Sequence, residues 1–121
     1  MTHQEARLSA RLDYVELPLD DFPASKAFFE NAFGWALKSY GSDYAVSEGP
    51  STELGLNGHS TDLTSAPLPA IRVDDLEMAL ARVEAAGGNV TRAIFAFPGG
   101  RRFHFREPSG NELAVYVNEA G

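Results

Sequence analysis

The chain has 121 residues, of which 44% are hydrophobic and 8 are Phe, 4 Tyr and 1 Trp, so it can bury one core and is expected to form a single domain. It contains no cysteine, which excludes disulfides, thiol catalysis and thiolate metal sites. The formal net charge of −7 comes from scattered acidic residues; this argues against a nucleic-acid partner and favours a cationic ligand, although solubility alone also accounts for such a charge. No stretch approaches the roughly 18 apolar residues of a membrane span, and the N-terminus lacks the apolar core of a signal peptide, so we expect a soluble cytoplasmic protein.

The first half of the chain predicts a strand followed by a helix. Residues 1–10 have no clear pattern and are expected to form a loose arm or a short helical extension. Apolar residues alternate with others over residues 12–19, which predicts a strand with one aliphatic face toward a helix and one face free for polar chemistry. The aliphatic face carries Val15, Leu17 and Leu19, and the opposite face carries Tyr14, Glu16 and Pro18.

The predicted helix begins after Asp20 or Asp21, either of which can cap it, and ends at Gly34 in a left-handed C-terminal cap. Its apolar stripe is expected to consist of Phe22, Phe29, Ala32 and Phe33. Three short strands are predicted next, at residues 35–40, 44–47 and 53–56. Turn residues separate these strands at 41–43 and 49–51.

The second half of the chain is a relaxed copy of the first. Placing Asp21 on Asp75 gives an offset of 75 − 21 = 54, which also places Gly34 on Gly88. The copy predicts a strand at 68–73, a helix behind Asp75, and strands at 89–96, 101–106 and 112–117. The chain is therefore expected to have an α+β fold of two βαβββ modules, at about residues 11–57 and 68–118, with a linker at about 58–67.

Several motifs in this order resemble the vicinal oxygen chelate superfamily, which includes glyoxalase I, extradiol dioxygenases and bleomycin-resistance proteins. The matching stretches are residues 16–21, 28–35, 73–76, 87–88 and 105–113, and the resemblance covers about residues 11–118. It implies that the two modules form curved mixed sheets around a cleft. We also expect a homodimer, because open edge strands and an apolar cleft favour pairing.

Metal-dependent members of that superfamily hold an ion with His or Glu in the first and last strand of each module. The resemblance places those positions at Tyr14, Gly55, Leu68 and Ala114. Leu, Ala and Gly cannot coordinate a divalent ion, and a lone Tyr substitutes poorly for His or carboxylate. A shifted site would have to use Glu16, Glu53, His59, His104 or Glu112, of which only Glu16 has a good claim to the cleft. We therefore predict no metal and no cofactor.

Glu16 is the leading candidate for chemistry, because it is a carboxylate on the non-helix face of a strand built otherwise from Leu, Val, Tyr and Pro. It would hold a cationic or hydroxyl group of a ligand, or act as a general base. The structural alternative is a buried pair between Glu16 and Arg72 or a tyrosine.

His104 lies between Phe103 and Phe105. If both phenylalanines face the helix, His104 lines the cleft beside Arg102 and Arg106, where it would bind an anion or transfer a proton; a satisfied histidine on a surface strand is the alternative. Aromatic walls favour planar ligands, so Tyr44 and Tyr116 are candidates for stacking or for core filling. The predicted ligand-binding residues are Tyr14, Glu16, Arg72, His104 and Tyr116.

The leading hypothesis is a metal-free protein that, like the bleomycin-resistance type, binds a small organic ligand, cationic or aromatic, in its cleft. A second hypothesis is a glyoxalase-like lyase or isomerase with Glu16 as the base. A third is a non-catalytic structural or regulatory module. Whether any catalysis is retained is left open by the sequence.

Overall fold

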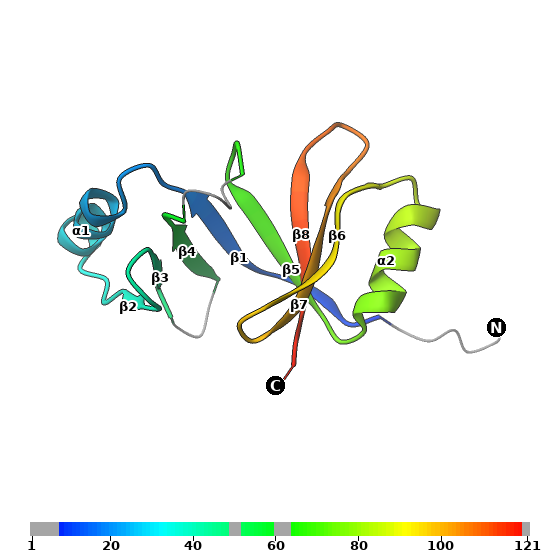
Figure 1. Cartoon of the computed structure of the whole chain (residues 1–121), viewed down its shortest axis with the longest axis horizontal. Helices are drawn as coiled ribbons and strands as arrows, with labels where there is room; N and C mark the ends of the chain where they lie inside the picture. The colour runs from blue at the N-terminus through cyan, green and yellow to red at the C-terminus, as the bar shows by residue number, and fades with distance from the viewer. Residues whose placement is uncertain (1–7, 49–51, 60–63, 120–121) are drawn as a thin grey trace. The chain divides into compact units, whose positions relative to one another are not determined.

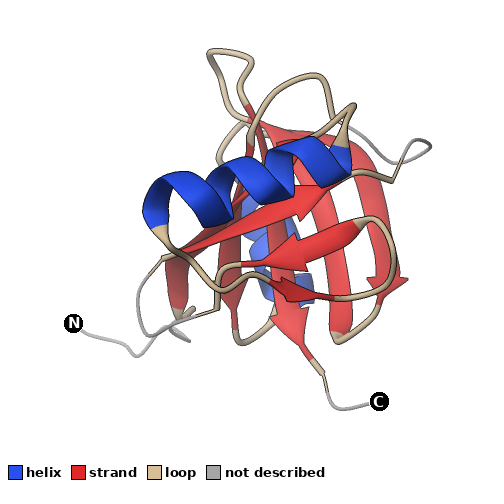
Figure 2. Ribbon diagram, turned by 90° about the vertical axis from the view of Figure 1, so that its left-hand side faces the viewer, coloured by secondary structure: helices blue, strands red, loops and turns tan. Residues whose placement is uncertain are grey.

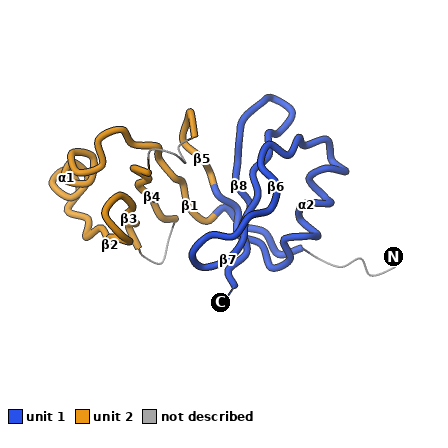
Figure 3. Tube along the Cα trace, viewed as in Figure 1, with its two compact units in different colours: residues 1–12, 70–121 blue, residues 13–69 orange. Residues whose placement is uncertain are grey.

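The computed structural model describes residues 8–48, 52–59 and 64–119, and Figure 1 shows its strands and helices. The chain divides into two compact units, one of residues 13–69 (unit 2) and one of residues 1–12 and 70–121 (unit 1), as Figure 3 shows. Each unit contains one helix and a mixed sheet, as the α+β prediction requires. No helix in the described part of the chain is long and apolar enough to cross a membrane.

Unit 2 contains the βαβββ elements of the first half of the chain. They are β1 (Ala10–Pro18, from residue 13 onward), α1 (Phe22–Phe33), β2 (Lys38–Ser39), β3 (Tyr44–Val46) and β4 (Glu53–Asn57). The strand order is β2-β3-β4-β1, with β1 parallel to β4 and the other pairs antiparallel. The predicted strand at 35–40 is shorter in the structure, and the predicted turn at 49–51 lies outside the described residues.

The ends of α1 are those predicted from the sequence. Asp21 is the N-cap, because its side chain accepts a hydrogen bond of 3.1 Å from the backbone N–H of Ala24. Gly34 adopts the left-handed conformation, with φ of 71°, and its N–H donates to the carbonyl of Glu30. The helix lies against one face of its strands (Figure 2).

The core of unit 2 is small. Phe22 and Phe29 of α1 pack against four buried residues that form it. These four residues are Leu19, Leu37, Ala45 and Leu56. The predicted apolar stripe is wrong for Ala32 and Phe33, which are exposed. Phe33 is the last helical residue, and it stacks on Phe29 and Trp35.

Unit 1 contains the second copy of the pattern. Its elements are β5 (Leu68–Val73, from residue 70 onward), α2 (Leu76–Ala85), β6 (Asn89–Phe97), β7 (Gly100–Arg106) and β8 (Glu112–Asn118). The strand order is β5-β8-β7-β6, with β5 parallel to β8 and the other pairs antiparallel. Its core is formed by Val73, Leu76, Ala79, Phe103, Phe105 and Val115.

The N-terminal arm is not loose where it is described. Leu8 packs against the core of unit 1, and the N–H of Ser9 donates to the Asp74 carboxylate at 3.1 Å. The strand β1 begins at Ala10, two residues earlier than predicted. Residues 1–7 of the predicted arm lie outside the described part of the chain.

Candidate functional site

The face of the unit 2 sheet opposite α1 carries a buried polar cluster around Glu16. Leu17 of β1 is in register with the core residue Leu56, so the neighbouring Glu16 and Gly55 lie on the other face. Only 3% of Glu16 is exposed. A buried carboxylate requires hydrogen bonds, and the strands around β1 supply them.

Both carboxylate oxygens of Glu16 accept hydrogen bonds. The Tyr44 hydroxyl of β3 donates to Oε1 at 3.1 Å, and the Asn57 amide of β4 donates to Oε2 at 3.2 Å. The amide orientation of Asn57 is fixed because its oxygen accepts the backbone N–H of His59 at 3.0 Å. Tyr44 and Asn57 thus help to hold Glu16 in position, and a hydrogen bond between Glu16 and a tyrosine, predicted as the structural alternative, is present.

Gly55 provides the space that this cluster needs. A Cβ atom at Gly55 would lie 2.7 Å from the Tyr44 hydroxyl and 3.8 Å from Cδ2 of Tyr14. A side chain at residue 55 would therefore push Tyr44 away from Glu16. The two tyrosine rings flank this position, which puts aromatic surface next to the carboxylate.

The corresponding face of the unit 1 sheet is rich in arginine. Phe103 and Phe105 pack in the core beside α2, so Arg102 and His104 point to the other face, as predicted. Arg72 of β5 is in register with Tyr116 of β8, which is in register with Arg102.

Tyr116 and Arg72 contact neighbours within this unit. Tyr116 packs edge-on against Phe97, with ring centroids 6.0 Å apart, and is 9% exposed, so it fills space between strands. In the Asn118 amide orientation that gives hydrogen-bond partners to both its nitrogen and its oxygen, the oxygen accepts a hydrogen bond of 3.3 Å from the Arg72 guanidinium.

His104 is held by a carboxylate. Its Nδ1 lies 3.4 Å from Oε2 of Glu112, and that oxygen also accepts the Thr91 hydroxyl at 3.0 Å. Burial and the nearby positive charge of Arg102 lower the pKa of His104, although Glu112 acts in the opposite direction. The imidazole is therefore neutral at physiological pH.

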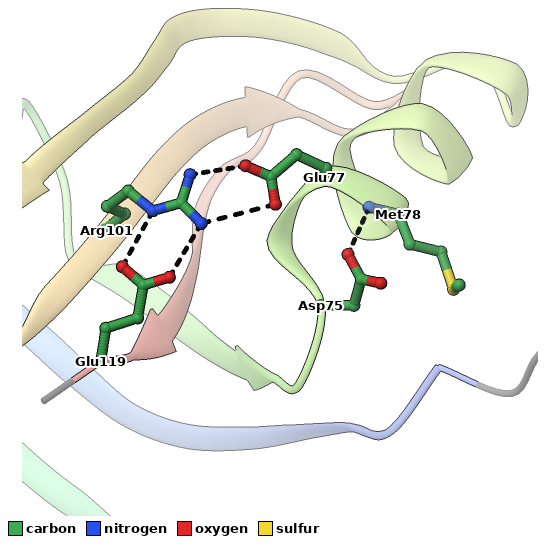
Figure 4. A network of polar contacts seen from close by, with 5 residues as sticks. All are labelled: Asp75, Glu77, Met78, Arg101 and Glu119. Carbon is green, nitrogen blue, oxygen red and sulfur yellow. Dashed lines mark hydrogen bonds and ion pairs between the residues drawn. The ribbon is translucent and has the colours of Figure 1, made fainter.

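Arg101 differs from its neighbour Arg102 in its position, because the Arg101 side chain lies on the helix side of the sheet and that of Arg102 on the opposite side. Its guanidinium binds both oxygens of Glu119 at 2.9 Å and also the Glu77 carboxylate of α2 (Figure 4). These hydrogen bonds raise the pKa of Arg101 and lower the pKa of Glu77 and Glu119. The charge of Arg101 is thus matched by two carboxylates, and this network ties α2 to β7 and the end of β8.

The residues at three of the four metal positions implied by the resemblance cannot coordinate a metal ion, and a lone Tyr14 substitutes poorly for His or carboxylate. Leu68, Ala114 and Gly55 have no coordinating side-chain atom, and the space at Gly55 is occupied by the Tyr44 hydroxyl. In the ranges that the structure describes, no group of three or more His, Asp or Glu side chains comes close enough to hold an ion.

The structure also identifies participants that sequence reasoning missed. The predicted strand ended at residue 56, so Asn57 was left outside it. In the structure Asn57 belongs to β4 and lies on the same sheet face as Gly55. Extending the alternation by one residue would have found it. Thr91 and Glu112 orient His104 from β6 and β8. No signal in the sequence joins these two residues, because they are 21 residues apart and meet only through the register of three strands.

The family model described as Glyoxalase/Bleomycin resistance protein/Dioxygenase superfamily matches residues 11–115. No curated protein matches the chain.

Solved structures resemble the chain over nearly its whole length. Methylmalonyl-CoA epimerase from Mycobacterium tuberculosis has 15% identity and a TM-score of 0.71, covering 90% of this chain and 88% of the epimerase. A superfamily member from Vibrio splendidus 12B01 has 20% identity and a TM-score of 0.65, covering 92% of this chain and 100% of that protein. The Mn(II)-bound glyoxalase from Novosphingobium aromaticivorans has 25% identity and a TM-score of 0.64, covering 90% of this chain but 40% of the glyoxalase.

Proposed function

The chain belongs to the Glyoxalase/Bleomycin resistance protein/Dioxygenase superfamily, and from this premise we propose that it binds a small organic ligand at the Glu16 cluster without a chelated metal. The observation that carries the proposal is the buried Glu16 carboxylate, fixed by Tyr44 and Asn57 on the sheet face opposite α1. A fixed carboxylate beside aromatic rings suits a ligand that combines a cationic or hydroxyl group with a planar part. The net charge of −7 favours the approach of a cation to the protein as a whole.

The test is binding of metal-free bleomycin, a cationic aromatic compound, measured by isothermal titration calorimetry. We expect binding by the wild-type protein and an affinity at least about tenfold lower for Glu16→Gln, because a charge-assisted hydrogen bond is lost. Glu30→Gln is the matched control, since it removes an equal charge from the surface of α1. Equal affinities of the two variants would contradict a role for Glu16.

A second candidate function is proton transfer with Glu16 as the general base. The fixed position of the carboxylate favours it, because a base must be aligned with the proton that it removes. Methylmalonyl-CoA is a suitable probe in deuterated water, because three of the similar solved structures are methylmalonyl-CoA epimerases. Loss of deuterium incorporation in Glu16→Gln with retained binding would support catalysis, and loss of binding alone would support ligand sequestration. If neither bleomycin nor methylmalonyl-CoA binds, the third hypothesis, a non-catalytic module, is favoured.

We also propose that the protein acts in the cytoplasm as a homodimer. Unit 2 exposes three aromatic side chains that a second copy would cover: Phe28 at 58%, Phe33 at 59% and Trp35 at 41%. Light scattering should give the mass of a dimer, and Phe33→Asp should shift it toward the monomer. A monomer mass that does not change with concentration would reject the proposal.

A further inference from the structure

A cavity of about 430 Å³ lies on the helix side of the unit 2 sheet. Its floor is formed by Val15 of β1 and Leu54 of β4, which are in register and half-buried. Alternation along β1 places Glu16 on the opposite face, so this cavity is separate from the Glu16 cluster. The rim residues Trp35 and Glu48 are exposed, which lets a small molecule reach the floor from solvent.

The rim residue Trp35 is held in place by two phenylalanines of α1. Its indole stacks on Phe29, with ring centroids 5.9 Å apart, and on Phe33, at 5.3 Å. Trp35 is still 41% exposed, and it lines the cavity. Of the aromatic side chains, Trp attracts a cation most strongly. An indole held beside an apolar floor thus suits a ligand that has both an apolar and a cationic part.

The rim residue Glu48 supplies a carboxylate. Its neighbour Ser47 is tied to the floor, because the Ser47 N–H donates to the Leu54 carbonyl at 3.0 Å and the Leu54 N–H donates to the Ser47 hydroxyl at 2.9 Å. Glu48 accepts a hydrogen bond from the neutral Tyr40 hydroxyl, and its other oxygen lies 4.0 Å from Nζ of Lys38. The Lys38 and Glu48 side chains are 63% and 45% exposed, and ion pairs at such sites contribute little, so a ligand ammonium can replace the lysine.

Unit 2 carries a charge equal to that of the whole protein. Residues 13–69 contain nine Asp and Glu, two Lys and no Arg, which gives 2 − 9 = −7, whereas the acidic and basic residues of unit 1 balance. Among the described residues that line the cavity, none is Lys, Arg or His. Glu53 also lines it and adds to the negative field, although alternation in β4 places its side chain on the face of Gly55. The cavity therefore attracts cations.

We propose that this cavity binds a small organic amine in its protonated form. The apolar part of the amine contacts Val15 and Leu54, and its ammonium group is held by the Glu48 carboxylate and the indole of Trp35. A volume of about 430 Å³ is typical of cavities that bind small molecules. The proposal does not rest on ligand binding at the Glu16 cluster, so either can fail without the other.

The test compares phenethylamine with 2-phenylethanol, which has the same ring and chain length but no charge. The chain has 1 Trp, so the tryptophan fluorescence of the full chain reports directly on the cavity. At about pH 7 the amine is protonated, and we expect it to change the fluorescence saturably and to bind about tenfold more tightly than the alcohol. Equal affinities, or no saturable change with the amine, would overturn the proposal.

Variants then assign the ammonium group to Glu48. Glu48→Gln should remove most of the preference for the amine, because it removes the charge and keeps an acceptor for the Tyr40 hydroxyl. Glu30→Gln is the matched control, since it removes the same charge from unit 2 outside the cavity. Glu16→Gln should also leave amine binding unchanged. If either of these two variants weakens binding as much as Glu48→Gln, the amine is bound at the Glu16 cluster or held by the general field, and the cavity site is wrong.

Trp35 also belongs to the aromatic surface that a second copy is proposed to cover. The two proposals combine it with different residues, Phe28 and Phe33 for the second copy and Val15 and Glu48 for the amine. Light scattering with saturating phenethylamine should therefore give the same mass as without it. A dimer that the amine dissociates would mean that the second copy occupies the cavity, and would overturn the amine site.

Discussion

The two βαβββ units follow one plan, but their helices bury very different amounts of apolar surface. In unit 1, α2 buries Leu76 and Ala79, whereas α1 of unit 2 has no buried residue. The strands differ in the same way, since β6 and β7 have nine and seven residues and β2 and β3 have two and three. A repeated connectivity thus does not require an equal core, and unit 1 is expected to hold most of the stability.

The faces turned away from the helices differ in chemistry. The offset of 54 residues places Ala70 of unit 1 at the equivalent of Glu16 (16 + 54 = 70), so the buried carboxylate has no copy. Unit 1 instead carries arginines and His104 on its strand β7. The neighbouring strand β8 provides Glu112 beside them. Duplication supplied two scaffolds, and the polar residues then diverged.

The largest expected effect tests the difference between the cores. Phe103 is 0% exposed in unit 1, and Phe103→Ala should lower the free energy of unfolding by about 3–5 kcal/mol, because it leaves a cavity. Phe33→Ala in unit 2 removes the same ring from a residue that is 59% exposed, and should cost less than about 1 kcal/mol. Urea denaturation measures both, and equal losses would show that the two units do not differ as described.

The next effect tests the space beside Glu16. Gly55→Ala should destabilise the protein by about 1–3 kcal/mol, because its Cβ would lie 2.7 Å from the Tyr44 hydroxyl. In Tyr44→Phe the nearest ring atom is 3.4 Å away, so the added methyl group should cost much less in that background. A double-mutant cycle by urea denaturation measures the coupling. Additive losses would mean that the contact between a side chain at residue 55 and the Tyr44 hydroxyl is not the reason for the glycine at this position.

Most of the fold followed from the sequence, because alternation and helix caps are local. Asp21 and Asp75 cap their helices as predicted, and the core side of β7 is that expected from Phe103 and Phe105. The offset of 54 fails at the end of α2. There the left-handed residue is Gly87, with φ of 99°, and not Gly88, the equivalent of Gly34.

The candidate sites were predictable only in part. The alternation placed Glu16 and His104 on the faces opposite the helices, but their partners come from other strands. Extending the alternation by one residue would have found Asn57, whereas Thr91 could not be assigned, because the register of the strands decides which side chains meet. The surface position of Phe33 was also missed, since an apolar residue in a helical stripe is indistinguishable from a core residue until the end of the helix is fixed.

A smaller effect tests the equivalence of the two helix caps. Asp21→Ala and Asp75→Ala should each lower the free energy of unfolding by about 1 kcal/mol, because each removes the acceptor for one backbone N–H in the first turn. The neighbouring Asp20→Ala is the control, and it should change stability by less than about 0.5 kcal/mol. Thermal unfolding compares the three variants. A loss in Asp20→Ala as large as in Asp21→Ala would assign the effect to charge and not to capping.

The smallest effect is the pH dependence contributed by His104, which has no equivalent in unit 2. Burial and Arg102 lower its pKa in the folded protein, partly offset by Glu112, with Arg92 acting in the same direction as Arg102. The unfolded chain therefore takes up a proton below about pH 6.5 while the folded protein does not, so stability is full above this pH and falls as the pH decreases. His104→Gln removes this dependence, and the stability gap between wild type and variant should narrow from about pH 8 to about pH 5 in urea denaturation. A gap that widens toward acidic pH would mean that the folded protein stabilises the imidazolium.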